Sequence, residues 1–277
     1  MPVPEKYSMR FMLTMKPDLT GLQIWVTRPA AQAIPWAKEL TSLGAETVVQ
    51  PMLAIEALSS AVDTAAIKNT LMNLDKYQKA IFVSQNAVEY GTEWIDRYWP
   101  QLPVCLNFFA IGETTAALLE DKLAHLDAII DSPRHAMNSD ALLQLAGLQQ
   151  VEGERILIFR GKGGRTHLGK SLEARGALID YCELYARLVP KSIDKDKISA
   201  LIESKLTTVI AVHSGETLDN LCKAVNKTEL QWMKQQALLL PGERVANIAN
   251  ALGFTKLIIA ENATHESMIG ALNDWRQ

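Results

Sequence analysis

The strongest constraint on the fold is an internal repeat that spans most of the chain. Gly44 follows Arg28 by 16 positions, and Gly176 follows Arg160 by the same interval. An alanine comes directly after each of these two glycines. The two copies of the pattern lie 132 positions apart, which is far longer than one unit of a solenoid.

A second pair of landmarks repeats in the same order. Ser84 ends an apolar run and precedes Gly112 by 28 positions, as Ser214 precedes Gly242, and these copies lie 130 positions apart. A length of 277 residues already gives an expectation of about two domains. The repeat therefore predicts two similar small α/β domains with a cleft that holds the functional site. Taken alone, it predicts tandem domains that divide near residue 150.

Short apolar runs alternate along the chain with longer segments of helical character. The runs lie at 22–27, 79–84 and 106–111 in the first copy, and at 155–160, 207–213 and 236–240 in the second. Strands that alternate with helices form parallel sheets with helices on both faces. We therefore expect an α/β fold in which ligands bind where the strands end and the helices begin.

The junctions between these strands and helices carry small or polar residues. They lie at 27–29, 84–86, 112–115, 160–165, 214–215, 242–244 and 262–264. Backbone N–H groups at helix N termini are unpaired and bind anions, so a cleft shared by these turns would suit a ligand with many carboxylates. For each turn taken alone, an ordinary helix cap is the alternative.

The Gly-rich turn at 161–165 is the most suggestive junction, because Lys162 and Arg165 add positive charge to it. The turn matches neither the GxGxxG fingerprint nor the spacing of a phosphate loop. A flexible turn with solvated charges is its alternative interpretation. A surface ion pair is the corresponding alternative for Arg28 and Arg160, which end equivalent strands.

Composition argues against several classes of function. A formal net charge of −3 gives no overall attraction to nucleic acid or to an anionic membrane. No stretch of about 20 uncharged apolar residues predicts a transmembrane helix. The three cysteines, odd in number and without a CxxC pair, fit a reducing cytosol without disulfides. The first 20 residues lack the apolar core of a secretory signal, and we expect them to form a loose extension.

Candidate catalytic residues are few. The five histidines show no metal-ligand spacing, and the chain has no GxSxG motif. His213 and Ser214 are adjacent at the end of a strand, so their side chains point to opposite faces and make a poor nucleophile pair. Tyr185 lies near the end of the extended run 178–188, where a phenol could donate a proton at the mouth of a cleft. Packing is the alternative role for this tyrosine.

Taken in order, these turns resemble those of the uroporphyrinogen-III synthase family. The resemblance covers about residues 22–272, and the ordered set of motifs with near-family spacing carries it. The motifs of the first half are VTRP (26–29), LGA (43–45), QPM (50–52), SQNAV (84–88) and AIGETTA (110–116). Those of the second half are RGKGGR (160–165), RGA (175–177), LYAR (184–187), the turn at Ser214, RVA (244–246) and NAT (262–264). Two positions depart from the family: Val83 stands where a Thr is frequent, and His213-Ser214-Gly215 is an unusual second serine turn.

The resemblance implies a more specific architecture than the repeat does. It implies two similar lobes, each a parallel sheet flanked by helices, joined by a two-stranded connector. One lobe is discontinuous and consists of residues 1–52 and 190–277, whereas residues 58–186 form the other. The chain would cross between lobes at 53–57 and 185–189. In this arrangement each lobe takes its first βα unit from the other half of the repeat.

The resemblance also implies a reaction. Family members cyclise the linear tetrapyrrole hydroxymethylbilane to uroporphyrinogen III, with loss of water and inversion of the last pyrrole ring through a spiro intermediate. No cofactor or metal is implied, because the pyrrole nitrogen lone pairs drive the expulsion of hydroxide. Tyr185 matches the family tyrosine and becomes the expected proton donor. The expected contacts to the eight substrate carboxylates are Arg28, Ser84, Asn86, Thr115, Arg160, Gly161, Arg165, Ser214, Arg244 and Thr264, many of them through backbone N–H groups.

Beyond this substrate, the resemblance implies a cytoplasmic monomer without nucleic-acid or membrane partners. Two other classes of function stay open at the level of sequence. A non-catalytic, two-lobed sensor or binding protein for an anionic small molecule would show similar turns. A nucleotide-dependent α/β enzyme is the third interpretation, although the chain lacks a complete phosphate fingerprint.

Overall fold

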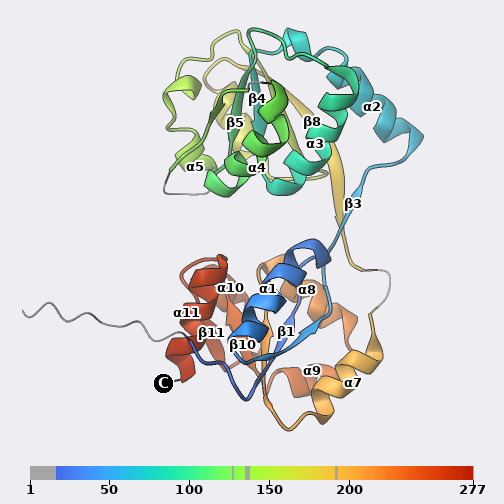
Figure 1. Ribbon diagram of the computed structural model, residues 1–277, viewed down its shortest axis with the longest axis vertical. Helices are drawn as coiled ribbons and strands as arrows, with labels where there is room; N and C mark the ends of the chain where they lie inside the picture. The colour runs from blue at the N-terminus through green and yellow to red at the C-terminus, as the bar shows by residue number, and fades with distance from the viewer. Residues whose placement is uncertain (1–16, 127, 135–137, 191–192, 277) are drawn as a thin grey trace, which may run out of the picture. The chain divides into compact units, whose positions relative to one another are not determined.

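The computed structural model describes residues 17–126, 128–134, 138–190 and 193–276, which form two compact units. Unit 1 holds the described residues up to Ala54 together with those from Val189 onward, and unit 2 holds Ile55–Leu188 (Figure 1). The chain therefore passes from one unit to the other twice. Most of the extension expected at the N terminus lies outside the described residues.

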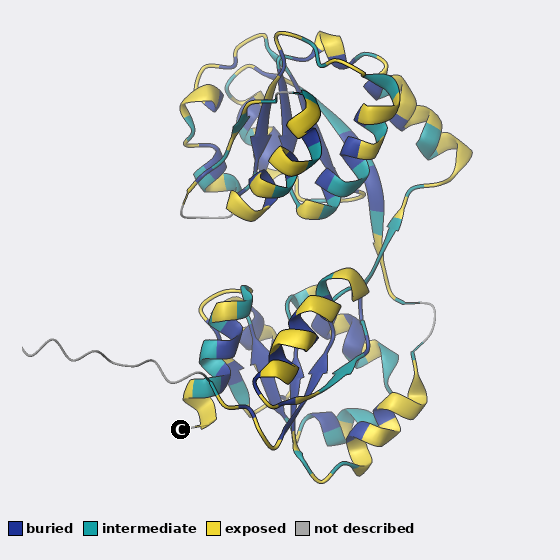
Figure 2. Cartoon of the chain, in the orientation of Figure 1, coloured by how far each residue is buried: buried dark blue, intermediate teal, exposed yellow. Residues whose placement is uncertain are grey.

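Unit 1 is built on a five-stranded parallel sheet in the order β11-β10-β9-β1-β2. The strands are β1 (Leu22–Val26), β2 (Glu46–Val49), β9 (Thr207–Ala211), β10 (Ala237–Leu240) and β11 (Leu257–Ile259). The helices are α1 (Ala30–Ser42), α7 (Lys195–Glu203), α8 (Gly215–Ala224), α9 (Lys227–Met233), α10 (Glu243–Ala251) and α11 (His265–Arg276). Buried strands lie between helices whose outer faces are exposed (Figure 2).

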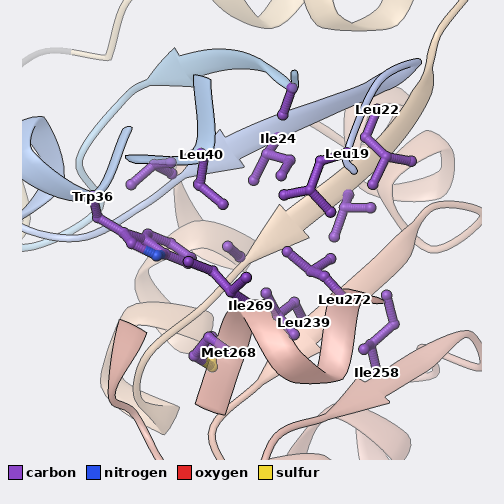
Figure 3. Close-up of a cluster of buried hydrophobic side chains, with 14 of the residues drawn as sticks. Leu19, Leu22, Ile24, Trp36, Leu40, Leu239, Ile258, Met268, Ile269 and Leu272 are labelled. Carbon is purple, nitrogen blue, oxygen red and sulfur yellow. The ribbon is translucent and has the colours of Figure 1, made fainter. Parts of the chain in front are cut away.

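Strand β1 shows how the sequence fills both faces of this sheet. All five of its residues are buried, and successive side chains of a strand point to opposite faces. Ile24 and Val26 pack into a cluster with Trp36 of α1 and with α11 (Figure 3). Trp25 packs into a second cluster with α7, α8 and α10. A continuous apolar run is therefore what a central parallel strand requires.

Unit 2 is built on a six-stranded sheet in the order β3-β8-β7-β4-β5-β6. Its strands are β3 (Ala54–Ala57), β4 (Lys79–Phe82), β5 (Asn107–Ala110), β6 (Ile130–Asp131), β7 (Arg155–Gly161) and β8 (Leu178–Leu188). The pairs from β8 through β6 are parallel. The helices are α2 (Ala61–Leu71), α3 (Gln85–Tyr98), α4 (Glu113–Leu123), α5 (Ser139–Leu142) and α6 (His167–Glu173), with 3-10 turns at Leu74–Lys76, Ala124–Leu126 and Ala146–Leu148.

The two strand orders are equivalent once the repeat is taken into account. Strands β1 and β2 begin the first copy, yet they lie beside β9, β10 and β11 of the second. Strands β7 and β8 begin the second copy, yet they lie beside β4, β5 and β6 of the first. Each sheet thus joins the first two strands of one copy to the last three of the other, and the unit 2 sheet adds β3 beside β8.

The expected fold class, two α/β lobes whose sheets are flanked by helices, is confirmed by this architecture. Within the described ranges, no helix has the length and apolar character needed to cross a membrane.

Candidate functional site

The residues predicted to bind substrate lie where parallel strands end, and they fall into one group in each unit. In unit 2, Ser84 and Asn86 follow β4, and Thr115 follows β5. Arg160 and Gly161 are the last two residues of β7, Arg165 follows that strand, and Tyr185 lies in β8. In unit 1 they follow β1 (Arg28), β9 (Ser214), β10 (Arg244) and β11 (Thr264). Parallel strands direct their carboxyl ends to one edge of a sheet, so each group shares an edge. The substrate contacts of these residues stay predictions.

Ser84 and Tyr185 are two predicted residues whose side chains form a hydrogen bond with each other. The Ser84 Oγ and the Tyr185 phenol oxygen lie 2.9 Å apart, a hydrogen bond in which either hydroxyl can be the donor. Tyr185 is buried, with 3% of its surface exposed, whereas Ser84 is half-buried. The Tyr90 ring lies 5.8 Å from the Tyr185 ring, centroid to centroid, and shields it on one side. The pair therefore places one phenol hydroxyl at a defined point of the sheet edge.

The register of β7 and β8 explains why Tyr185 reaches this point. The pairing is regular up to Arg160 with Glu183, and then slips so that Gly161 faces Tyr185. Lys162 donates its backbone N–H to the Tyr185 carbonyl at 2.7 Å and fixes the irregularity. A Cβ on Gly161 would lie 2.6 Å from Cε2 of the Tyr185 ring, so this position requires glycine. Gly161 thus makes room for the phenol in addition to any contact with substrate.

Arg160 is buried, and its guanidinium is used within its own turn. It donates to the carbonyls of Gly164 and Arg165, and it lies 3.7 Å from a Glu183 carboxylate oxygen. Its carbon Cζ lies 4.5 Å from the centroid of the Tyr181 ring. These contacts hold the Gly-rich turn in one conformation. The side chain of Arg165 is exposed at the surface of that turn.

The helix N termini at the two sheet edges differ in how they are capped. Ser84 and Ser214 each accept a hydrogen bond from the backbone N–H three residues on, so their hydroxyl oxygens already cap α3 and α8. Helices α1, α4 and α10 begin after Pro29, Gly112 and Gly242, which provide no side-chain cap. These three N termini therefore keep backbone N–H groups available to an anion.

The remaining predicted residues differ in exposure. Thr115 is buried in the first turn of α4, and Asn86 is half-buried in the first turn of α3. Arg244 is exposed on α10. Thr264 is half-buried and donates its hydroxyl to Asn262 Oδ1 at 2.6 Å, which orders the entry to α11.

Sequence reasoning missed a cluster of aromatic and basic residues at the edge of the unit 1 sheet. The His213 ring packs edge-on against Trp36 with ring centroids 4.7 Å apart, and the His265 ring stacks on Trp36 at 5.7 Å. Burial, the nearby Arg28 and His265 together lower the pKa of His213 to about 2. Burial also lowers the pKa of Arg28. The signal in the sequence was the unusual form of the second serine turn.

The described residues contain no group of three or more His, Cys, Asp or Glu placed to hold a metal ion.

The side chains of Tyr77, Arg155 and Asp180 form a polar cluster in unit 2 whose members bond to one another. Asp180 accepts from the Tyr77 hydroxyl at 2.9 Å and from Arg155 at 2.8 Å. Tyr77 precedes β4 and Arg155 begins β7, so this cluster lies at the opposite edge of the sheet from Ser84.

The family model and the curated relatives that match this chain belong to one family. The sequence model of the family described as "Uroporphyrinogen-III synthase HemD" matches residues 35–270. The curated uroporphyrinogen-III synthases of Salmonella typhimurium and Escherichia coli are 32% and 31% identical to the chain. Each of these alignments covers 91% of this chain and 100% of the relative.

Two solved structures share the fold. One is a mutant uroporphyrinogen III synthase from Thermus thermophilus, with a TM-score of 0.57 and 15% identity over 92% of this chain and 97% of that one. The other is a uroporphyrinogen-III synthetase from Helicobacter pylori, with a TM-score of 0.56 and 16% identity over 92% of this chain and 99% of that one. At these identities the likeness concerns the fold alone.

The low pKa of His213 predicts that acid destabilises unit 1. Unfolding returns the imidazole to its ordinary pKa near 6.5, so below about pH 6.5 the unfolded chain binds a proton that the folded chain does not. The free energy of unfolding therefore falls as the pH falls from about 6.5 toward about 2. Between pH 7 and pH 5 we expect His213 to account for a loss of about 2 kcal/mol.

Urea unfolding at these two pH values measures this loss in the wild type and in His213→Val. The valine variant should lose about 2 kcal/mol less than the wild type on going to pH 5. The exposed His125, changed to Val, serves as the control and should behave like the wild type. Equal losses in the wild type and His213→Val would show that His213 is not buried as a neutral group.

Proposed function

The chain belongs to the uroporphyrinogen-III synthase family, and from this premise we infer how its residues carry out the reaction. It is a cyclising lyase of haem biosynthesis that converts hydroxymethylbilane to uroporphyrinogen III with loss of water. The observation that carries this assignment is the likeness over 91% of the chain, which covers the complete length of two relatives. A non-catalytic binding protein is not favoured, because the likeness is to enzymes.

Recognition of the substrate follows from its charge. The substrate is a polycarboxylate, and the uncapped N termini of α1, α4 and α10 offer backbone N–H groups at the sheet edges. Arg28, Arg165 and Arg244 add positive charge at the same edges. We propose that these groups hold the linear tetrapyrrole in the folded conformer that leads to ring inversion, so that orientation supplies much of the rate.

Tyr185 is the proposed proton donor. Loss of hydroxide from the terminal hydroxymethyl group needs a proton, and a phenol within hydrogen-bond reach can deliver it. The hydrogen bond to Ser84 and the burial of the ring support this role, because they fix the hydroxyl in one place. Ser84 Oγ is itself held by the N–H of Ala87 at 3.0 Å. The cap of α3 thus positions the proton donor through one hydroxyl.

The proposed step balances without a cofactor. The pyrrole nitrogen lone pair expels the hydroxyl, the C–O bond breaks, and the leaving oxygen takes the Tyr185 proton and departs as water. The substituted α carbon of the last ring then attacks the resulting azafulvene and gives a spiro intermediate. The bond from this carbon to its original bridging methylene breaks, which leaves a second azafulvene, and the free α carbon of the inverted ring closes the macrocycle by attacking it. The proton that leaves the macrocycle at the end of the sequence restores the phenol. The net change is loss of one water.

We also propose that the enzyme works in the cytoplasm as a monomer. It would act on a small-molecule substrate, without nucleic acid or membrane partners. Free thiols at Cys105, Cys182 and Cys222 support a reducing compartment.

The product isomer is the direct test of the function. Incubation of the chain with freshly prepared hydroxymethylbilane should give the type III isomer, at a rate above that of spontaneous closure. Oxidation of the products and chromatographic separation of the isomers measure this ratio. Type I product alone, formed at the spontaneous rate, would show that the chain binds tetrapyrroles without catalysing their closure.

The role of Tyr185 predicts a defined kinetic change. Tyr185→Phe keeps the ring and removes the hydroxyl, so kcat for the type III product should fall on the order of 100-fold with KM little changed. Tyr77→Phe is the matched control, because it also removes a phenol hydroxyl in unit 2 but at the opposite sheet edge. Near-normal kcat in Tyr185→Phe would remove the proposed role.

A further inference from the structure

Three neighbouring residues of unit 1 carry four buried polar atoms that have no hydrogen-bond partner in the described part of the chain. The atoms are Arg28 Nε, Trp36 Nε1 and both ring nitrogens of His213. Buried polar atoms are nearly always paired in folded proteins, because leaving them unpaired costs free energy. A cluster of them at the carboxyl edge of a parallel sheet therefore points to a missing partner.

The register of β1 and β9 places Arg28 and His213 side by side. Val26 pairs with Ala211, so Arg28 and His213 stand level two residues beyond that pair. Both lie on the same side of the sheet as Val26 and Ala211, which belong to the cluster around Trp36 shown in Figure 3. The hydroxyl of Thr27 donates to the Ala211 carbonyl at 2.7 Å and ties the two strands together at this level.

The equivalent residues of unit 2 show how the same place in the fold is filled when the arginine has partners within its own unit. Arg160 and Val83 occupy the corresponding places, two residues beyond the pair Ile158 and Ile81. There the guanidinium is used by the Gly-rich turn and by Glu183, and the position of the histidine is an apolar valine. Unit 1 has no such turn around Arg28 and carries a polar ring in place of the valine.

Among the described residues, no carboxylate forms a salt bridge with the Arg28 guanidinium, and burial is the cause of its lowered pKa. His265 Nδ1 lies 3.1 Å from a Glu39 carboxylate oxygen, which pairs this histidine but not Arg28. Arg28 and His213 are half-buried, and about a third of the His265 side chain is exposed. An anion can therefore approach from the His265 side.

We infer that Arg28 and His213 together bind one carboxylate of the substrate, and that Trp36 is a positioning residue beneath the His213 ring. This inference rests on the proposed function, and it adds His213 to the residues that recognise the tetrapyrrole. A guanidinium donates in a planar fork that suits the two oxygens of a carboxylate, and a neutral imidazole donates through one N–H. The edge-on contact with Trp36 fixes the plane of that imidazole.

The experiment that tests this inference changes His213 to the residue found at the corresponding place in unit 2. His213→Val should fold well, because valine fills that place in the other sheet without an unpaired polar atom. KM for hydroxymethylbilane should rise at least about 10-fold, the usual effect of losing a hydrogen bond to a charged group, with kcat nearly unchanged. His125→Val is the control for the same substitution at an exposed site in unit 2 and should leave KM unchanged.

A double variant tests whether the two residues share one carboxylate. Arg28→Gln and His213→Val together should raise KM by much less than the product of the two single effects. Circular dichroism confirms that each variant is folded. An unchanged KM in His213→Val, or effects that multiply fully in the double variant, would overturn the inference while the wild type still makes the type III isomer. A wild type that makes none would instead refute the proposed function and the inference with it.

Discussion

The pairing of β7 with β4 on one side and β8 on the other is the constraint on which the candidate catalytic pair depends. Because all three strands are parallel, Ser84 after β4 and Tyr185 in β8 arrive at the same sheet edge. The shift in strand register at Gly161 then sets the position of Tyr185 relative to β7. Because Gly161 has no side chain, the Tyr185 ring fits beside it. The 2.9 Å contact between the two hydroxyls follows from these registers and not from nearness in sequence.

The same principle acts in unit 1 with different chemistry. Strands β1 and β9 are separated by most of the chain, yet their register sets Arg28 level with His213. The two sheets have equivalent strand orders, so differences between equivalent residues are informative. Arg160 stabilises its own turn, whereas the buried Nε of Arg28 has no hydrogen-bond partner among the described residues. The repeat thus gives one sheet edge a phenol and the other a basic cluster.

Much of this architecture could be predicted from the sequence. The largely apolar runs within 22–26 and 155–161 are typical of central parallel strands, which are buried on both faces. The capping box of Asn226 and Glu229 was a readable signal for α9 that the sequence analysis passed over. The hydrogen bonds of Arg160 could not be predicted from the sequence, because its partners are carbonyls of a turn whose conformation the sequence does not specify. The contact of His213 with Trp36 depends on strand pairing between distant segments, and no local pattern predicts it.

The central claim is that Ser84 acts through Tyr185, and a double-variant cycle in kcat tests it most directly. Ser84→Ala should slow formation of the type III isomer, and the double variant with Tyr185→Phe should be no slower than Tyr185→Phe alone. Ser60→Ala, which removes the cap of another helix in unit 2, controls for lost stability. Losses in kcat that multiply fully in the double variant would contradict the account, because the two hydroxyls would then act independently.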